Sequence, residues 1–365
     1  PAGWAFRTEG LPTEWVWVRA GGGRSLVWGG WLLKPPAQSW RDAEAFERPW
    51  PFTLQDIESH MRRAAHLMGA RDAELLPHFE AVGRSLGLKV EAKRVAPGPC
   101  GCRAFVAMDI LKAARLRPMS VVTRVLIDTK GHAEGVAFTD ARSGEHGVAR
   151  AKAVVLSASP VETTRLLLDS LGGLDRDARR HIGKGLVDHF VAGCLVLVPG
   201  PAASADPQTP FRRAAFVPRF VNMGRSIRRD YRGGFSVEIH GPDPLSELDT
   251  DTLRALNVPL EEAAGFSFFT VHAIGETAPH TGRFVSLHPA DRDGFGRPVP
   301  VLHLVRGEND RRMARDMDET ARAIADALAT PGCTIHPIKE TLGTVELSHE
   351  AGTCRIGRSD RTSAV

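Results

Sequence analysis

The chain has 365 residues, which is enough for two domains or for one large α/β unit. Hydrophobic residues make up 42% of it, charged residues 25%, and the formal net charge is +4, values typical of a soluble globular protein. The arginines are spread along the chain and there is one tyrosine, which argues against nucleic-acid binding. No apolar run reaches the ~20 residues of a membrane helix. We therefore expect a soluble protein of the cytoplasm or the periplasm.

The first half of the chain predicts helices between irregular segments. Residues 21–35 are rich in glycine around an apolar centre, and we expect an irregular segment that buries Leu26, Val27 and Trp28. Residues 54–69 have apolar side chains at helical spacing, with Thr53 and Asp56 suited to cap the helix. A second amphipathic helix is predicted over 72–86, ending at Gly87, and a loop over 97–102.

From residue 117 the pattern changes to alternating β-type runs separated by turns. We expect an antiparallel meander that leads into a buried strand at 154–156, followed by a helix over 159–170. Further strand-like runs over 190–305 predict a large, mostly antiparallel sheet. Residues 309–329 predict a long helix with one apolar stripe, formed by Met313, Met317, Ala321, Ile324 and Leu328. The predicted fold class is mixed α/β, of the α+β type.

Three stretches have residue types suited to ligand binding or proton transfer. The glycines from Gly21 let backbone N–H groups approach an anion or a planar ring, although such loops are more often plain turns. The small turn Ser157–Ser159 suits either a phosphate at a helix N-terminus or an ordinary corner. His349 precedes a Gly-Thr turn and can accept a proton near neutral pH; a lone histidine more often has no such role.

The cysteines favour neither a zinc site nor a disulfide framework. Cys100 and Cys102 form a C-x-C, the other three are isolated, and no second pair is available to complete a zinc site. We therefore expect reduced thiols and no metal.

Five segments, in this order, together resemble the glucose-methanol-choline (GMC) flavoprotein oxidoreductases. They are GGGRSLVWGG (21–30), the helical segment 48–69, the strands and corner in 116–128 and 151–170, IGKGLVDHF (182–190), and SHEAGTCRIGRSDRTSAV (348–365). The family's opening βαβ unit with G-x-G-x-x-G, and its second catalytic His or Asn about forty residues after the first, have no counterpart here. The resemblance implies a fragment with an incomplete Rossmann-like FAD-binding domain, which we expect to be colourless or weakly yellow.

The resemblance also implies roles for particular residues. His349 would be the base that takes the hydroxyl proton while a hydride leaves carbon for flavin N5. Contact with the flavin ring is implied for Gly22, Gly23, Arg24, Ser25, Leu26, Val27, Trp28 and Gly29. Val122 would contact adenine, and Ser157, Ala158 and Ser159 would line the adenosine and pyrophosphate region. Val27 stands where some sugar oxidases of the family carry a flavin-bonded histidine, which implies non-covalent FAD.

The same resemblance divides the chain into domains. Parts of the FAD-binding domain are expected at 1–45 and 96–190, and the start of its C-terminal segment at 342–365. Lid helices of the substrate domain are expected at 46–95, and the rest of that domain at 191–341. Ser159 and Thr164 replace the family's usual Gly and Pro at the corner, so the resemblance does not determine the backbone conformation there.

The function implied is FAD-dependent oxidation of a CH–OH group of a sugar or another alcohol, closest to the bacterial sugar-oxidising branch. Two alternatives stay open: a catalytically incompetent fragment or binding module, and a non-redox, lyase-type member of the same fold. The sequence leaves the substrate, the oligomeric state and the electron acceptor (oxygen, a quinone or a cytochrome) undetermined.

Overall fold

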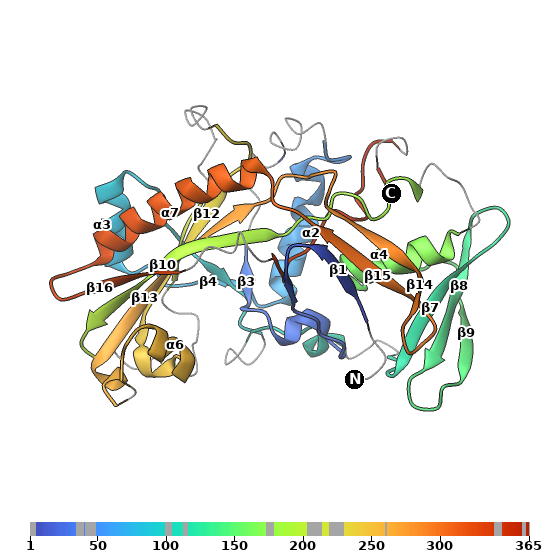
Figure 1. Ribbon diagram of the computed structural model, residues 1–365, viewed down its shortest axis with the longest axis horizontal. Coiled ribbons are helices and arrows are strands. Elements are labelled where there is room, and N and C mark those ends of the chain that lie inside the picture. The colour runs from blue at the N-terminus through green and yellow to red at the C-terminus, as the bar shows by residue number, and fades with distance from the viewer. Residues whose placement is uncertain are drawn as a thin grey trace.

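The computed structural model is elongated, with a large sheet at one end and a small three-stranded sheet at the other (Figure 1). It describes residues 5–33, 40, 49–98, 104–111, 116–172, 179–202, 214–218, 230–259, 261–338, 345–359 and 363–364. Helices and antiparallel strands alternate along the chain, as expected for the mixed α/β class. Among the described residues, no helix is long and apolar enough to cross a membrane.

The large sheet has six strands, every neighbouring pair of which is antiparallel. In spatial order they are β16 (Thr334–Ile338), β10 (His189–Pro199), β13 (Phe266–Glu276), β12 (Phe235–Pro244), β11 (Ala214–Val217) and β5 (Glu91–Ala92). Side chains alternate between the two faces. The buried residues of β12 and β13, such as Val237, Ile239 and Val271, face α7 (Glu308–Leu328), and their neighbours face the other way.

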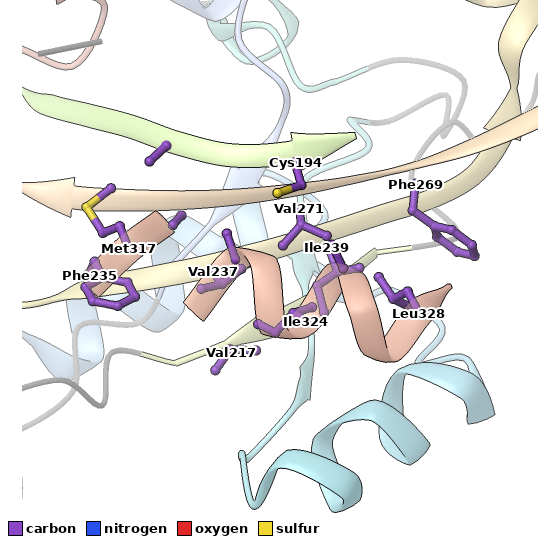
Figure 2. Close-up of a cluster of buried hydrophobic side chains, with 14 of the residues drawn as sticks. Cys194, Val217, Phe235, Val237, Ile239, Phe269, Val271, Met317, Ile324 and Leu328 are labelled. Carbon is purple, nitrogen blue, oxygen red and sulfur yellow. The ribbon is translucent and has the colours of Figure 1, made fainter. Parts of the chain in front are cut away.

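Helix α7 covers one face of this sheet and confirms the predicted apolar stripe (Figure 2). Met313, Met317, Ala321 and Ile324 are fully buried and Leu328 is nearly so. Burying a side chain of this size contributes about 1.5–3 kcal/mol, so the stripe is the main attachment of α7 to the sheet. Most polar residues of α7 lie on its solvent side, but Asp310 and Asp316 are buried.

Two helices of the first half differ in how well they were predicted. Helix α2 (Leu54–Leu67) starts with the expected capping box between Thr53 and Asp56. Helix α3 (Pro77–Leu86) ends at Gly87, in the left-handed conformation that glycine favours, but it begins five residues later than predicted. Residues Arg71–Asp72 form strand β4, which pairs with β6 (Arg94–Val95) beside β3 (Trp31–Leu32).

Two small sheets join segments that are distant in sequence. Strand β1 (Arg7–Gly10) pairs in parallel with β15 (Pro298–Leu304), which is antiparallel to β14 (Phe284–Arg292). The prediction placed β14 and β15 in the large antiparallel sheet, and this is wrong. Strand β2 (Thr13–Trp15) pairs in parallel with β17 (Val345–Leu347), which brings the chain's two terminal regions together.

The other end of the molecule is the meander β7 (Ser120–Ile127), β8 (Ala133–Asp140) and β9 (His146–Arg150), against which α4 (Ser159–Ser170) packs. The buried strand predicted at 154–156 is wrong: these described residues form no strand, and Val155 is 86% exposed. No described strand lies beside them to supply ladder hydrogen bonds. The remaining short helices are η1 (Gly23–Leu26), η2 (Ala107–Asp109), η5 (Leu245–Glu247), α6 (Thr250–Ala255) and η6 (Ala263–Gly265).

Candidate functional site

The glycine-rich loop forms a short 3-10 turn, η1, that presents apolar side chains to solvent. Gly22 and Gly23 have positive φ angles of 97° and 53°, which glycine adopts at little cost. The expectation that Leu26 and Val27 are buried is wrong, since they are 45% and 59% exposed. Trp28 is partly buried and donates its indole N–H to the carbonyl of Phe105 at 2.6 Å.

Arg24 joins this loop to the residues on either side of His349. Its Nη1 donates to the carbonyl of Ser348 at 2.8 Å and to Oε2 of Glu350 at 2.6 Å, and its Nη2 donates to Oε1 of Glu350. Its Nε donates to the carbonyl of Val16 at 3.1 Å. The Glu350 side chain is fully buried, so this two-pronged ion pair holds the loop and the His349 segment in one register.

The segment after His349 runs antiparallel to residues 183–188. Val187 and Ala351 exchange backbone hydrogen bonds of 3.0 and 2.9 Å, and Gly183 donates to the carbonyl of Thr353 at 2.7 Å. Gly352 has φ +94°, and a Cβ there would lie 2.1 Å from the Gly185 carbonyl oxygen. Glycine is therefore required at position 352, because the two chain segments approach each other closely there.

Asp188 lies at the centre of this contact, with its carboxylate buried. One oxygen, Oδ1, accepts from the backbone N–H and from Nδ1 of His189, both at 2.7 Å. The other, Oδ2, accepts from the backbone N–H groups of Ser348 and His349 at 3.0 and 3.1 Å. One carboxylate thus holds two histidines that are 160 residues apart.

The two imidazoles face each other. Nδ1 of His349 lies 3.3 Å from Nδ1 of His189, and the ring centroids are 4.8 Å apart. His349 is exposed and His189 is partly buried. We call Asp188, His189 and His349 the Asp188 cluster. Three ligand-type atoms of this cluster lie within 4.8 Å of one another; because each Asp188 oxygen already accepts two N–H groups, the arrangement is that of a hydrogen-bonded network.

The sequence alone pointed to only one member of this cluster. Asp188 and His189 are visible as a neighbouring carboxylate–imidazole pair, but no nucleophile lies near them in sequence, and His349 is 160 residues away. The partner arrives through the β2–β17 pairing and the antiparallel contact of residues 183–188 with 348–353. The signal in the sequence was the Asp188–His189 pair itself, which lies where residues 182–188 lead into strand β10.

Residues expected at the adenosine end of FAD gather around a second feature, an apolar cavity of about 460 Å³. Val122, Ser157 and Ala158 line it together with small side chains, namely Gly135, Ala149, Ala151 and Ala153. The volume lies within the range of about 300–1,000 Å³ of small-molecule pockets. The cavity is therefore large enough for a heteroaromatic base and has no charged group in its lining.

Ser159 begins α4 in a left-handed conformation, with φ 68°. Such an angle is unusual for a residue with a side chain, and it accounts for the glycine that the GMC family has at this place. The Oγ of Ser159 is buried and has no hydrogen-bond partner among the described residues. The carbonyl of the next residue, Pro160, accepts from Thr353 Oγ1 at 3.1 Å, so the corner contacts the segment that carries His349.

A further cluster of ionisable groups lies on the face of the large sheet that points away from α7. The buried ammonium of Lys93 forms an ion pair with Glu238, which also accepts from His240 Nε2 at 3.2 Å. Lys93 lies 3.4 Å from the centre of the Trp31 ring, and His272 pairs in register with Glu238. We call Lys93, Glu238, His240 and His272 the Glu238 cluster.

The charges of this cluster follow from its burial. Burial raises the pKa of Glu238, but the hydrogen bond from His240 and the charge of Lys93 outweigh it and lower the pKa to about 2. Burial lowers the pKa of Lys93 to about 8, and burial with the charge of His240 lowers the pKa of His272 to about 4. At neutral pH the cluster therefore contains an ionised pair and a neutral His272.

Residues 102–191 match the family model of the GMC oxidoreductases. Over this region the chain is similar to that family. The matched region contains the meander, α4 and the Asp188–His189 pair, so the lining of the 460 Å³ cavity and two of the three members of the Asp188 cluster lie in the part that the GMC model describes.

Two curated relatives resemble the chain over most of its length. One is a C-glycoside 3-oxidase of Microbacterium trichothecenolyticum, 27% identical over 260 residues that cover 67% of this chain and 44% of the relative. The other is a 2-methyl-1,2-propanediol dehydrogenase of Mycolicibacterium austroafricanum, 24% identical over 252 residues, 65% of this chain and 44% of the relative. The chain thus spans less than half the length of these two relatives.

A solved structure has the same fold. It is a formate oxidase of Aspergillus oryzae RIB40, determined to examine how a mutation affects FAD modification. The TM-score is 0.59 at 14% identity, and the match covers 99% of this chain and 80% of the other. This likeness supports the mixed α/β GMC fold.

Proposed function

We propose that the chain is the part of an FAD-dependent oxidoreductase that contacts the cofactor and an alcohol substrate, and that it serves to oxidise a CH–OH group of a sugar or another alcohol. The observation that carries this proposal is the convergence of three segments. Arg24 attaches the glycine loop to the residues flanking His349, and Thr353 attaches the same segment to the corner at Pro160.

The residues present fit FAD. The 460 Å³ cavity accepts the adenosine end, with Val122, Ser157 and Ala158 in its wall. The partnerless Oγ of Ser159 is available to a phosphate oxygen, and the exposed Leu26 and Val27 provide an apolar surface for a flat ring. When bound, FAD supplies the hydride acceptor for alcohol oxidation.

His349 is the group proposed to move the proton. Its Nδ1 faces His189, which leaves Nε2 to face a substrate hydroxyl. With its proton on Nδ1, directed at Ser348 Oγ 3.5 Å away, the neutral imidazole of His349 has its lone pair on Nε2, which accepts the hydroxyl proton as the C–H bond breaks. The exposed position of His349 allows that contact, and the two backbone hydrogen bonds of Ser348 and His349 to Asp188 limit where the ring can lie.

The two curated relatives support the proposed substrate class. Their names specify a C-glycoside in one case and a diol in the other, both of which carry CH–OH groups. One is called an oxidase and the other a dehydrogenase, so the electron acceptor of this chain stays open. We propose non-covalent FAD, because Val27, the counterpart of a flavin-linking histidine, has no nucleophilic atom.

The test is anaerobic reduction of added FAD by a panel of sugars and diols. We expect the purified chain to retain little flavin, since Val155 in the wall of the cavity is 86% exposed, but to bind FAD when it is added in excess. A substrate of the proposed class should then bleach the flavin absorbance. His132→Ala, which removes an exposed histidine in the β7–β8 turn, serves as the control that should leave bleaching unchanged.

Two outcomes would overturn the proposal. One is failure of saturating FAD to bind, which would favour a binding module. The other is tight FAD binding without bleaching by any alcohol, which would favour a non-redox use of the fold. Flavin that stays with the protein after acid precipitation would contradict the non-covalent mode.

A further inference from the structure

We propose that Asp188 is a positioning residue that orients two imidazoles at once, so that His189 and His349 act as one coupled pair. The inference rests on the proposed role of His349 as the proton-accepting group. It concerns a residue 161 positions from His349 in sequence, whose carboxylate would touch neither substrate nor flavin but acts through the two histidines.

Asp188 is itself held in place by its surroundings. Its backbone N–H donates to Thr277 Oγ1 at 3.2 Å, and the Thr277 hydroxyl donates to the Asp188 carbonyl. Arg283 and Arg306 line the small cavity beside it, and Arg283 is paired with Asp310. The charge of Asp188 is one of the influences that oppose the lowering of the pKa of Arg306 by burial. The carboxylate therefore has a fixed position and is next to positive charge.

The carboxylate of Asp188 fixes the backbone at His349. Oδ2 accepts the backbone N–H groups of Ser348 and His349. These donors lie at the end of β17, just before the turn that Gly352 allows. Two hydrogen bonds from consecutive residues to one oxygen fix the backbone from which the His349 side chain projects, and so limit the positions its ring can occupy.

The carboxylate of Asp188 also determines which ring nitrogen of His189 carries the proton. An ionised carboxylate only accepts hydrogen bonds, so the 2.7 Å contact between Asp188 Oδ1 and His189 Nδ1 requires the proton on Nδ1. The tautomer of His189 is then fixed, and its protonated nitrogen is 3.3 Å from Nδ1 of His349. A proton gained by either ring therefore places a positive charge next to the other ring.

The decisive variant is Asp188→Asn, because an amide of the same shape has a single acceptor oxygen. If that oxygen keeps the two backbone N–H groups of residues 348 and 349, the amide NH₂ group faces His189 Nδ1. We expect His189 to change from the Nδ1–H to the Nε2–H tautomer, observed in the ring ¹⁵N shifts of histidine-labelled chain without added FAD. With FAD, the rate of flavin reduction should fall by about 10- to 100-fold, with little change in substrate affinity.

The chain offers a matched control, Asp128→Asn. Asp128 also accepts two backbone N–H groups, from Lys130 and His132, and lies 3.3 Å from a histidine Nδ1, that of His132, but it is in an exposed turn. This variant should leave the ¹⁵N shifts of His189 and His349, and the rate of flavin reduction, unchanged. A comparable loss of rate in both variants would contradict a specific role of Asp188.

A second variant keeps the proposal testable if Asp188→Asn does not fold. His189→Gln leaves Asp188 bound to the backbone of Ser348 and His349, and removes only the facing ring. The pH at which the His349 ring signals titrate should then shift, while the melting temperature changes little. Unchanged His189 ring shifts in Asp188→Asn, or an unchanged His349 titration in His189→Gln, would overturn the proposal. Because these signals need no cofactor, they are read separately from whether FAD is reduced.

Discussion

The Asp188 cluster and the Glu238 cluster each combine a buried or half-buried carboxylate with histidines. One histidine of each, His189 and His272, lies on the same face of the large sheet. His272 of the second cluster pairs with Gly193, four residues along β10 from His189, which is about 13 Å. Their chemistry nevertheless differs. In the Glu238 cluster an ammonium ion, Lys93, neutralises the carboxylate under the Trp31 ring.

In the Asp188 cluster the described hydrogen-bond donors to the carboxylate are backbone N–H groups and an imidazole, and one member, His349, is exposed. Only a histidine that a ligand can reach can exchange protons with it. Composition alone, a carboxylate with histidines, therefore does not identify a proton-transfer site; the groups that hydrogen-bond to the carboxylate and the exposure of a histidine do. The following variants test this difference, from the largest expected effect to the smallest.

Replacing the reachable histidine should affect rate and not stability. His349→Ala should slow FAD reduction by substrate about 10²- to 10⁴-fold, because the proton-accepting group is removed, with little change in melting temperature. His240→Ala, in the Glu238 cluster, should show the reverse: a lower melting temperature with FAD reduction by substrate close to that of the unchanged chain. Stopped-flow absorbance and thermal melts measure the two effects, and an equal loss of rate in both variants would remove the distinction between the clusters.

Breaking the buried ion pair should cost stability. Lys93→Met leaves the Glu238 charge without its ammonium partner, and we expect unfolding free energy to fall by about 3–5 kcal/mol, measured by denaturant unfolding. The double variant Lys93→Met/Glu238→Gln removes both charges and should recover most of the loss. Equal stability of the single and double variants would mean that Lys93 and Glu238 are not coupled.

The neutral, buried His272 predicts acid sensitivity. Its folded-state pKa of about 4 lies below the ordinary 6.5, so the unfolded state binds more protons between these values. Stability therefore falls as pH drops from 6.5 towards 4, by about 3 kcal/mol from this group. His272→Gln should lose less stability than the unchanged chain between neutral pH and about pH 4, and His132→Gln, at an exposed site, should behave as the unchanged chain does.

The smallest effect concerns the attachment of the glycine loop. Arg24→Lys keeps the positive charge but cannot form the two-pronged contact with Glu350 and the bonds to Ser348 and Val16 together. We expect a loss of about 1–2 kcal/mol in unfolding free energy and weaker FAD binding, measured by flavin fluorescence titration. A stability loss with unchanged FAD affinity would separate the loop from the cofactor site.

The elements predicted correctly are those determined by local patterns. The capping box at Thr53 and Asp56, the stripe of α7 and the meander of β7 and β8 depend on residues close in sequence. Strand β9 was missed because its residues follow turn-forming ones and are mostly exposed. Residues 154–156 have strand composition, but no described neighbour provides the pairing that would make them a strand.

The site depends on contacts that no local pattern contains. Arg24 meets Glu350 across 326 positions, and Asp188 meets His349 across 161. Similarity to the GMC family indicated His349 and the glycine loop, but the exposure of Leu26 and Val27 follows from the turn geometry of η1 and was predicted wrongly. The role of Asp188 could be seen only once the two segments were placed together.

The most direct test of the account is the pH dependence of a single anaerobic reduction of bound FAD by a sugar or diol substrate, from about pH 5 to about pH 9. If His349 takes the proton, the rate of the unchanged chain rises with pH as an imidazole loses its proton and then levels off, and His349→Ala is slow and lacks this rise. Persistence of the same rise in His349→Ala would show that another group takes the proton, and would contradict the account.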